Sequence, residues 1–291
     1  MEIVWDEPAE LGEGALWDIG SKAFYWVDIP GKKAMCYDPV TKTNKEWSTP
    51  TDCGTVVVCE DGHLAVSQQD GFYKINTDTG YCFVLNKCNN NPEVRFNDGK
   101  CDPAGRFWSG TMSYDDGRYI SGLYSLDFDN KVVQYLDKIG VSNGLVWNSK
   151  GDKFYYIDTP TKRVDCFDYN MDTGEIKNRK VVIDLRDCLG YPDGCCIDAE
   201  GMLWIAFWGG SRIGRYNPRT GKLLEDIVLE NVELVTACAF GGKNLDELYI
   251  TTARAILNEE QRRNQVHAGK LFRTKVANTQ GVPSYRFKSP V

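Results

Sequence analysis

The chain has 291 residues, of which 42% are hydrophobic, so it can bury the core of one large domain or two average ones. Its formal net charge is −7 at pH 7 and no Lys/Arg cluster occurs, so neither nucleic acid nor an anionic membrane surface is an expected partner. The first residues lack the basic segment and long apolar core of a secretion signal. No apolar run approaches the roughly 18 residues that span a bilayer. We therefore expect a cytoplasmic protein.

Eleven cysteines and two histidines limit the metal and nucleophile chemistry that the chain can support. The cysteine count is odd and no Cys-x-x-Cys occurs, so we expect reduced cysteines in the core. The adjacent Cys195 and Cys196 would point to opposite faces of a strand and could not bind one ion together. Because His63 and His267 are far apart in sequence, we expect neither a thiolate or imidazole zinc site nor a catalytic triad.

Six short apolar segments, each preceded by a turn, recur along the chain. Aligned on one equivalent residue, successive segments are 39 to 48 residues apart. Most are followed by a second short segment that contains an aromatic residue and ends in another turn. The aligned residues are Tyr25, Leu64, Phe107, Tyr155, Leu203 and Leu248.

Hairpins at a regular spacing of about 40–50 residues are typical of a β-propeller. We predict one all-β domain over residues 1–291, a six-bladed β-propeller with four-stranded antiparallel blades around a central channel. A β-sandwich with chance spacing is the alternative. Residues 2–5 or residues 284–288, both strand-like, should complete one blade and close the ring. Residues 259–265 interrupt the last repeat and are expected to form a short helix.

A second set of equivalent residues lies 10 to 12 positions before the aligned ones, where each blade's innermost strand should begin. These strands surround the channel, so the set should converge on one small volume. Its carboxylate and amide oxygens are the ligands that hard divalent cations prefer. Each polar-Gly pair alone is typical of a turn, and the shared repeat position is what favours a site. The set contains Glu13, Cys53, Asn97, Asn143, Asp193 and Thr236.

Five longer motifs give the chain a family resemblance, and they follow one another in the family's order. They are LGEGALW (11–17), RFNDGKCDPAGRFWSGTM (95–112), SNGLVW (142–147), YPDGCCIDAEGMLW (191–204) and AFGGKNLDELYIT (239–251). With these motifs the chain resembles the senescence-marker-protein/gluconolactonase/regucalcin-like family of sugar lactonases. The resemblance implies a six-bladed propeller that hydrolyses an aldonolactone, such as gluconolactone, as its small-molecule partner.

The resemblance also implies one catalytic divalent metal in the channel, held by Glu13, Asn143 and Asp193. Family members are described with calcium, zinc, manganese, magnesium or ferrous iron, so the metal identity stays open. Arg95 and Asn97 match residues that hold the sugar lactone. Some relatives carry a further acidic contact in the loop that follows GTM, but the corresponding loop here (113–121) has no evident match.

Lactone opening requires attack of water on an ester carbonyl, which a general base assists. Asp193 is the first candidate for this base, and Asp98, beside the substrate residues, is the second. The chain would act as a monomer or weak homodimer.

Three other functions remain open from sequence. The first is a cytosolic calcium-binding regulatory protein, because the ligand set does not separate a catalyst from a sensor. The second is a phosphotriesterase-like hydrolase, because a metal in a propeller channel can also activate attack at phosphorus. The third is an interaction scaffold, which predicts a channel without the charged ring that Glu13 and Asp193 would form.

Overall fold

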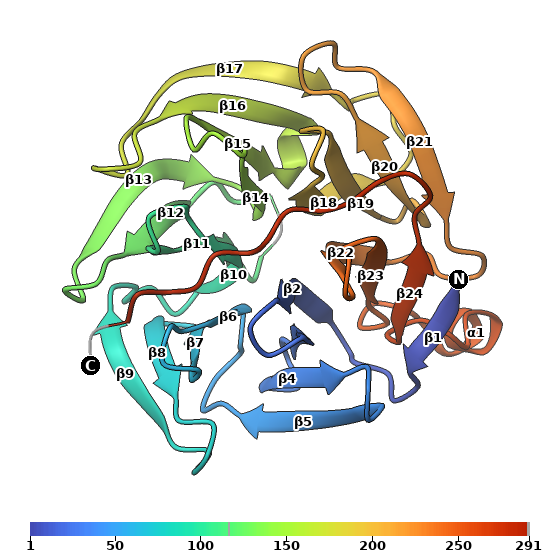
Figure 1. The fold of residues 1–291 in the computed structure, drawn as a ribbon, viewed down its shortest axis with the longest axis horizontal. Coiled ribbons are helices and arrows are strands. Elements are labelled where there is room, and N and C mark those ends of the chain that lie inside the picture. Colours follow the sequence, from blue (N-terminus) through green and yellow to red (C-terminus); the bar gives the residue numbers. More distant parts are fainter. Residues whose placement is uncertain (116, 290–291) are drawn as a thin grey trace.

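Six four-stranded antiparallel sheets surround a central channel in the computed structural model, which describes residues 1–115 and 117–289 (Figure 1). This arrangement confirms the predicted six-bladed propeller. In each blade the strands pair in chain order from the channel outward, with one exception in the last blade. The first strands of neighbouring blades contact one another all round the ring, so six inner strands line the channel.

Five blades each use four consecutive strands. Blade 1 contains β2 (Gly12–Asp18), β3 (Ala23–Asp28), β4 (Lys33–Asp38) and β5 (Thr43–Ser48). Blade 2 contains β6 (Thr55–Val58), β7 (Leu64–Ser67), β8 (Gly71–Ile75) and β9 (Cys82–Lys87). Blade 3 contains β10 (Val94–Cys101), β11 (Phe107–Ser113), β12 (Ser121–Leu126) and β13 (Val132–Ile139). Blade 4 contains β14 (Ser142–Trp147), β15 (Lys153–Asp158), the 3₁₀ turn η1 (Thr159–Thr161), β16 (Arg163–Tyr169) and β17 (Ile176–Asp184). Blade 5 contains β18 (Tyr191–Ile197), β19 (Leu203–Trp208), β20 (Arg212–Tyr216) and β21 (Leu223–Val228).

Blade 6 joins the two ends of the chain. Its inner strands are β22 (Val235–Gly241), β23 (Glu247–Thr252) and β24 (Leu271–Lys275). The outermost strand is β1 (Glu2–Trp5), which pairs antiparallel with β24 and closes the ring. Residues 2–5 therefore complete a blade, and of the two segments that the sequence offered for this role, residues 2–5 are the correct one. The short helix α1 (Glu259–Asn264) lies between β23 and β24, which confirms the expected insertion.

A repeated aspartate contact shapes the turn between the first two strands of blades 3 and 5. Asp102 accepts hydrogen bonds from the backbone of Arg106 (2.9 Å) and from the indole Nε1 of Trp108 (2.8 Å). Asp198 accepts the equivalent indole bond from Trp204 (3.0 Å). The Asp-x-x-Gly spacing in the sequence thus encodes a turn whose carboxylate also fixes a buried tryptophan.

The second candidate for closure, residues 284–288, belongs to a C-terminal segment (276–289) that crosses one face of the ring instead of joining a blade. In Figure 1 this segment is the dark red strand-free chain that runs over the centre. It leaves blade 6 with a hydrogen bond from Gly281 N to Leu245 O (2.7 Å). It then accepts a bond from Ala199 N of blade 5 at Gln280 O (2.8 Å).

The far part of the C-terminal segment is attached to three more blades. Arg286 donates from Nε and Nη2 to the two carboxylate oxygens of Asp18 in blade 1 (2.7 and 2.6 Å). Phe287 N donates to Val58 O of blade 2 (2.9 Å), and Lys288 N donates to Gly105 O of blade 3 (3.0 Å). The segment therefore ties five blades together across the ring.

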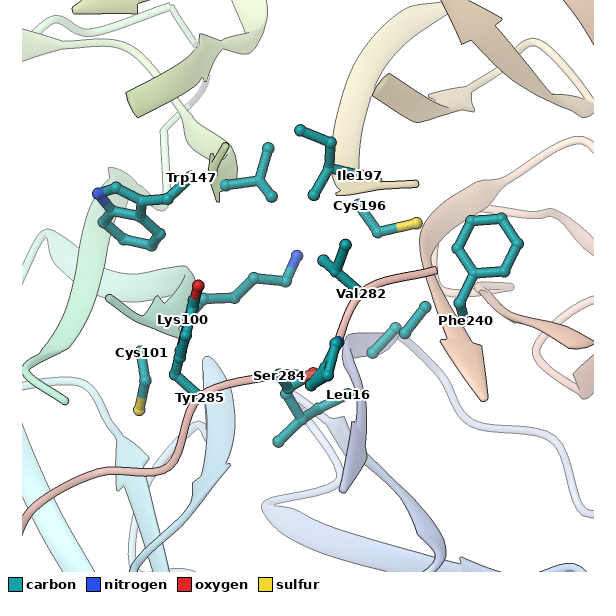
Figure 2. Close-up of a pocket in the computed structure, with 14 residues that line it drawn as sticks. Leu16, Lys100, Cys101, Trp147, Cys196, Ile197, Phe240, Val282, Ser284 and Tyr285 are labelled. Carbon is teal, nitrogen blue, oxygen red and sulfur yellow. The ribbon is translucent and has the colours of Figure 1, made fainter. Parts of the chain in front are cut away.

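Beneath this segment the channel ends in a small cavity of about 60 Å³. Figure 2 shows Lys100 of β10 extending into the cavity, with Val282, Ser284 and Tyr285 of the C-terminal segment beside it. The ammonium of Lys100 donates a hydrogen bond to Cys195 O of blade 5. The segment and the Lys100 side chain thus close one end of the channel.

Phe287 should be the main hydrophobic anchor of the C-terminal segment, because its side chain is fully buried. We expect Phe287→Ala to lower the free energy of unfolding by about 3–5 kcal/mol, measured by urea denaturation, since truncating a buried aromatic leaves a cavity. The matched control is Val40→Ala at a side chain that is 85% exposed, which should change the value by less than about 0.5 kcal/mol. A loss below about 1 kcal/mol for Phe287→Ala would show that the segment is only loosely held.

Candidate functional site

The predicted site residues lie at the end of the channel opposite the C-terminal segment. Each inner strand runs from one end to the other: β18 (Tyr191–Ile197) carries Asp193 near the open end and finishes with Ile197 at the opposite cavity. In the same way β10 carries Asn97 at the open end and Lys100 at the closed one. The open end is a pocket of about 470 Å³, within the usual size range of small-molecule sites.

The structure brings five predicted residues together in this pocket. They come from four different blades, and each is at most 6% exposed. Asp98 is equally buried, at 4% exposure, on the same strand as Arg95 and Asn97. The five are Glu13, Arg95, Asn97, Asn143 and Asp193.

The other two members of the predicted ring do not take part. Cys53 is fully buried just before β6, and its thiol lies 4.0 Å from Thr55 O. Thr236 is also fully buried, and its hydroxyl bonds to Gly12 O and to the hydroxyl of Thr251. Four of the six ring positions therefore line the pocket, and two serve the packing between blades.

A chain of hydrogen bonds fixes the amide side chains across three blades. Arg95 Nη1 donates to Asn97 Oδ1 (2.8 Å), and Asn97 Nδ2 donates to Asn143 Oδ1 (2.9 Å). Asn143 Nδ2 donates to Thr159 Oγ1 (2.9 Å), which in turn donates to Pro192 O (2.8 Å). The orientation of both amides is therefore determined, and Asn143 presents its oxygen toward Asn97 of the neighbouring blade.

Three carboxylates beside these amides have an oxygen without a hydrogen-bond partner among the described residues. These oxygens are Glu13 Oε2, Asp98 Oδ2 and Asp193 Oδ1, all of them buried. The second oxygen of Asp98 accepts from Gly99 N (2.8 Å). A buried polar atom without a partner is unfavourable, so three in one place indicate a missing cationic or hydrogen-bonding partner.

The electrostatics of the carboxylates agree with this interpretation. Burial raises the pKa of Glu13 to about 8, and the negative charge of Asp98 adds to the shift. Burial, together with the charges of Glu13 and Asp98, raises the pKa of Asp193 well above its ordinary value. Burial also raises the pKa of Asp98, against the opposing charge of Lys100. The three groups repel one another and favour a bound positive charge.

The donor set therefore fits a divalent cation held by Glu13, Asn143 and Asp193. The oxygens are two carboxylates and one amide, and two of the three residues carry the unpartnered atoms described above. Over residues 1–115 and 117–289, no group of three or more His, Cys, Asp and Glu side chains is arranged to hold a metal ion. A site here depends on the asparagine as its third protein ligand.

The sequence did not single out the upper wall of the pocket. Leu11, Met112, Val141, Tyr191 and Trp208 contribute mostly apolar surface there, next to Thr159, Pro160 and Gly117. Three of these residues precede a ring residue by two positions, a spacing that could have revealed them because side chains at i and i+2 share a strand face.

An acidic side chain also stands beside the loop 113–121, but it comes from the connection between blades 1 and 2. Tyr114 of the loop donates its hydroxyl to Asp52 Oδ2 (2.9 Å). Burial lowers the pKa of the Arg95 guanidinium, and the charges of Tyr114 and Asp52 oppose this shift, so both groups face Arg95. Asp116 of the same loop lies outside the described residues.

No helix in the described part of the chain is long and apolar enough to cross a membrane.

Fold and site together define a six-bladed β-propeller with a carboxylate- and amide-lined pocket at one end of its channel. The model of the SMP-30/Gluconolactonase/LRE-like region matches residues 11–254, and the chain belongs to this family. Among its relatives, regucalcin of Danio rerio is 37% identical over 289 residues, covering 99% of this chain and 98% of that protein. The protein named "Putative sugar lactone lactonase YvrE" of Bacillus subtilis is 37% identical over 268 residues, covering 92% of this chain and 91% of that one. The solved structure of a luciferin-regenerating enzyme superposes with a TM-score of 0.90 at 31% identity, covering 97% and 96% of the two chains.

The buried carboxylates should make the metal-free protein less stable as the pH rises. Between the ordinary pKa of Glu13, 4.5, and its folded value of about 8, the folded state holds a proton that the unfolded state has released. The contribution of Glu13 to stability is therefore full below pH 4.5 and is lost as the pH rises toward 8. We expect chelator-treated protein to lose on the order of 3 kcal/mol of unfolding free energy between pH 5 and 8.

Glu13→Gln should remove much of this pH dependence, because an amide cannot titrate. The control is Glu230→Gln at an exposed position, which should leave the slope unchanged. The measurement is urea denaturation at several pH values in the presence of chelator. An identical slope in wild type and Glu13→Gln would contradict the assigned electrostatics.

Proposed function

We propose that this protein hydrolyses a lactone, with a divalent metal at the open end of the channel, and that sugar aldonolactones such as gluconolactone are substrates. The main support is the group of three buried carboxylates with unpartnered oxygens, set beside an arginine and two oriented amides. Membership of the SMP-30/gluconolactonase family and the name of the Bacillus subtilis relative support the same reaction class.

In this proposal Glu13, Asn143 and Asp193 hold the metal, and calcium, zinc, manganese, magnesium and ferrous iron are the candidates. When bound, the metal would supply Lewis-acid polarisation of the ester carbonyl. The fold contributes rigidity, because the three ligands belong to inner strands of blades 1, 4 and 5.

Arg95 and Asn97 would orient the lactone and stabilise the charge that develops during ring opening. Arg95 Nη1 is already engaged by Phe96 O (3.0 Å) and Asn97 Oδ1 (2.8 Å), so the guanidinium is fixed before any substrate enters. A prepositioned cation of this kind stabilises negative charge on oxygen without reorganising during the reaction.

Proton transfer requires a base close to the attacking water. Asp193 is the first candidate because its Oδ1 is buried without a partner and the residue lines the pocket that a lactone would enter. Asp98, with an unpartnered Oδ2, is the second. The base takes a proton from the attacking water while the oxygen of this water bonds to the acyl carbon. The carbon–oxygen bond of the ring then breaks, and the proton passes to the ring oxygen to give the hydroxy acid.

A calcium-binding regulatory role is the second candidate, and the relatives named regucalcin favour it. Both candidates use the same carboxylates, so a measurement of hydrolysis separates them.

Metal dependence is tested with chelator-stripped protein and a panel of aldonolactones, one divalent metal being restored at a time. We expect hydrolysis to return with at least one metal. Glu13→Gln and Asp193→Asn should each lower kcat/KM by at least ~100-fold, because loss of a ligand exceeds the 10–100-fold effect of losing an outer partner. Metal binding without hydrolysis of any lactone would favour the calcium-binding role. Absence of metal binding would rule out both candidates.

Substrate orientation by Arg95 is tested separately. We expect Arg95→Met to raise KM by about tenfold or more, because a charged hydrogen bond to the substrate is lost, while a metal still binds in calorimetry. The matched control is the exposed Arg219→Met, which should leave KM unchanged. Unchanged KM in Arg95→Met would exclude the arginine from substrate binding.

A further inference from the structure

A second ring of side chains lies directly above the buried carboxylates and amides. It consists of the residues two positions before each ring residue, since alternate residues of a strand point to the same side. Four of its members, from blades 1, 3, 4 and 5, line the pocket together with the ring residue that follows them. These four are Leu11, Arg95, Val141 and Tyr191.

The second ring has a charged side and an apolar side. Arg95 is its one charged member among those that line the described pocket, and it stands on blade 3. Met112, Pro160 and Trp208 continue the surface of the other three members, and the backbone of Trp208 pairs with that of Tyr191. We call the six residues Leu11, Met112, Val141, Pro160, Tyr191 and Trp208 the apolar wall.

The side of the apolar wall offers few polar side-chain atoms, namely the hydroxyl groups of Thr159 and Tyr191 and the indole nitrogen of Trp208. The hydroxyl of Thr159 accepts from Asn143 and donates to Pro192 O, so it has no proton left for a ligand. The ring of Tyr191 is packed against the ammonium of Lys162, which lies 4.8 Å from its centroid. Lys162 in turn donates to Cys188 O (2.9 Å). Tyr191 therefore presents a supported aromatic surface.

The contrast between the charged side and the apolar wall should favour lactones with an alkyl substituent over lactones with hydroxyl groups in the same place. A hydroxyl group turned toward Leu11, Met112, Val141 or Pro160 would give up its hydrogen bonds to water without replacement, which opposes binding of a fully hydroxylated ring. An alkyl group in the same place would bury apolar surface, and one methylene in a hydrophobic pocket changes kcat/KM by about 10–200-fold. The pocket of about 470 Å³ has room for a substituent beyond the lactone ring.

We propose that the preferred substrates are lactones with an apolar substituent, bound with the ester group over the buried polar residues and the substituent against the apolar wall. This inference rests on the proposed lactonase function and defines its substrate class. Water adds to the acyl carbon, the ring carbon–oxygen bond breaks, and the product is a hydroxy acid that carries the apolar group on its hydroxyl end.

The test compares kcat/KM of the metal-loaded, full-length protein for gluconolactone, unsubstituted δ-valerolactone and alkyl-substituted δ-nonalactone. We expect the value for δ-nonalactone to exceed both others by at least about tenfold. Met112→Gln, which places an amide in the apolar wall at nearly constant volume, should lower the δ-nonalactone value about tenfold more than it lowers the δ-valerolactone value. The matched control, Met171→Gln at a side chain that is 45% exposed, should change neither.

The possible failures can be told apart. Gluconolactone as the best substrate, or equal values for all three lactones, would overturn the apolar preference and leave the lactonase function standing. The same is true if Met112→Gln lowers hydrolysis of δ-valerolactone and δ-nonalactone equally. Absence of hydrolysis of every lactone with every metal would overturn both proposals.

Discussion

The pairing of β1 with β24 is the contact on which the whole arrangement depends, because it closes the ring of blades. Once the ring is closed, the inner strand of each blade must face the common axis. Residues as far apart in sequence as Glu13 and Asp193 then meet in one pocket without any local contact that draws them together. Site geometry in this molecule is a property of the ring rather than of any single blade.

The ring also contains an unfavourable arrangement of buried charges. Glu13, Asp98 and Asp193 are buried together although their charges repel and burial disfavours ionisation. Aromatic contacts between blades, such as Trp17 and Phe24 stacked on Tyr249 at 5.4 and 5.0 Å, supply apolar packing that offsets this unfavourable cluster. Apolar packing between the blades thus offsets the unfavourable burial of carboxylates in the channel.

Sequence alone predicted the blade count, the inner strands and four of the pocket's side chains, because each blade repeats the same local pattern. The repeat alone put Cys53 and Thr236 at equivalent positions, and only the lack of a carboxylate or amide oxygen set them apart. The repeat fixes where a residue stands and not whether its polar atoms are engaged by neighbours. The path of residues 276–289 was also missed. That path depends on contacts with five blades, and a strand-like stretch such as residues 284–288 carries no local sign of them. Tyr191 and Trp208 were missed because their role arises only when blade 5 is folded.

The crossing of the ring by the C-terminal segment has a consequence for traffic through the molecule. The segment and the Lys100 side chain fill one end of the channel, where a cavity of only about 60 Å³ remains. The channel therefore has room for a small molecule at one end only. Any small molecule that reaches Asn97 and Asn143 enters and leaves by the same opening. One molecule must therefore leave the pocket before the next can enter.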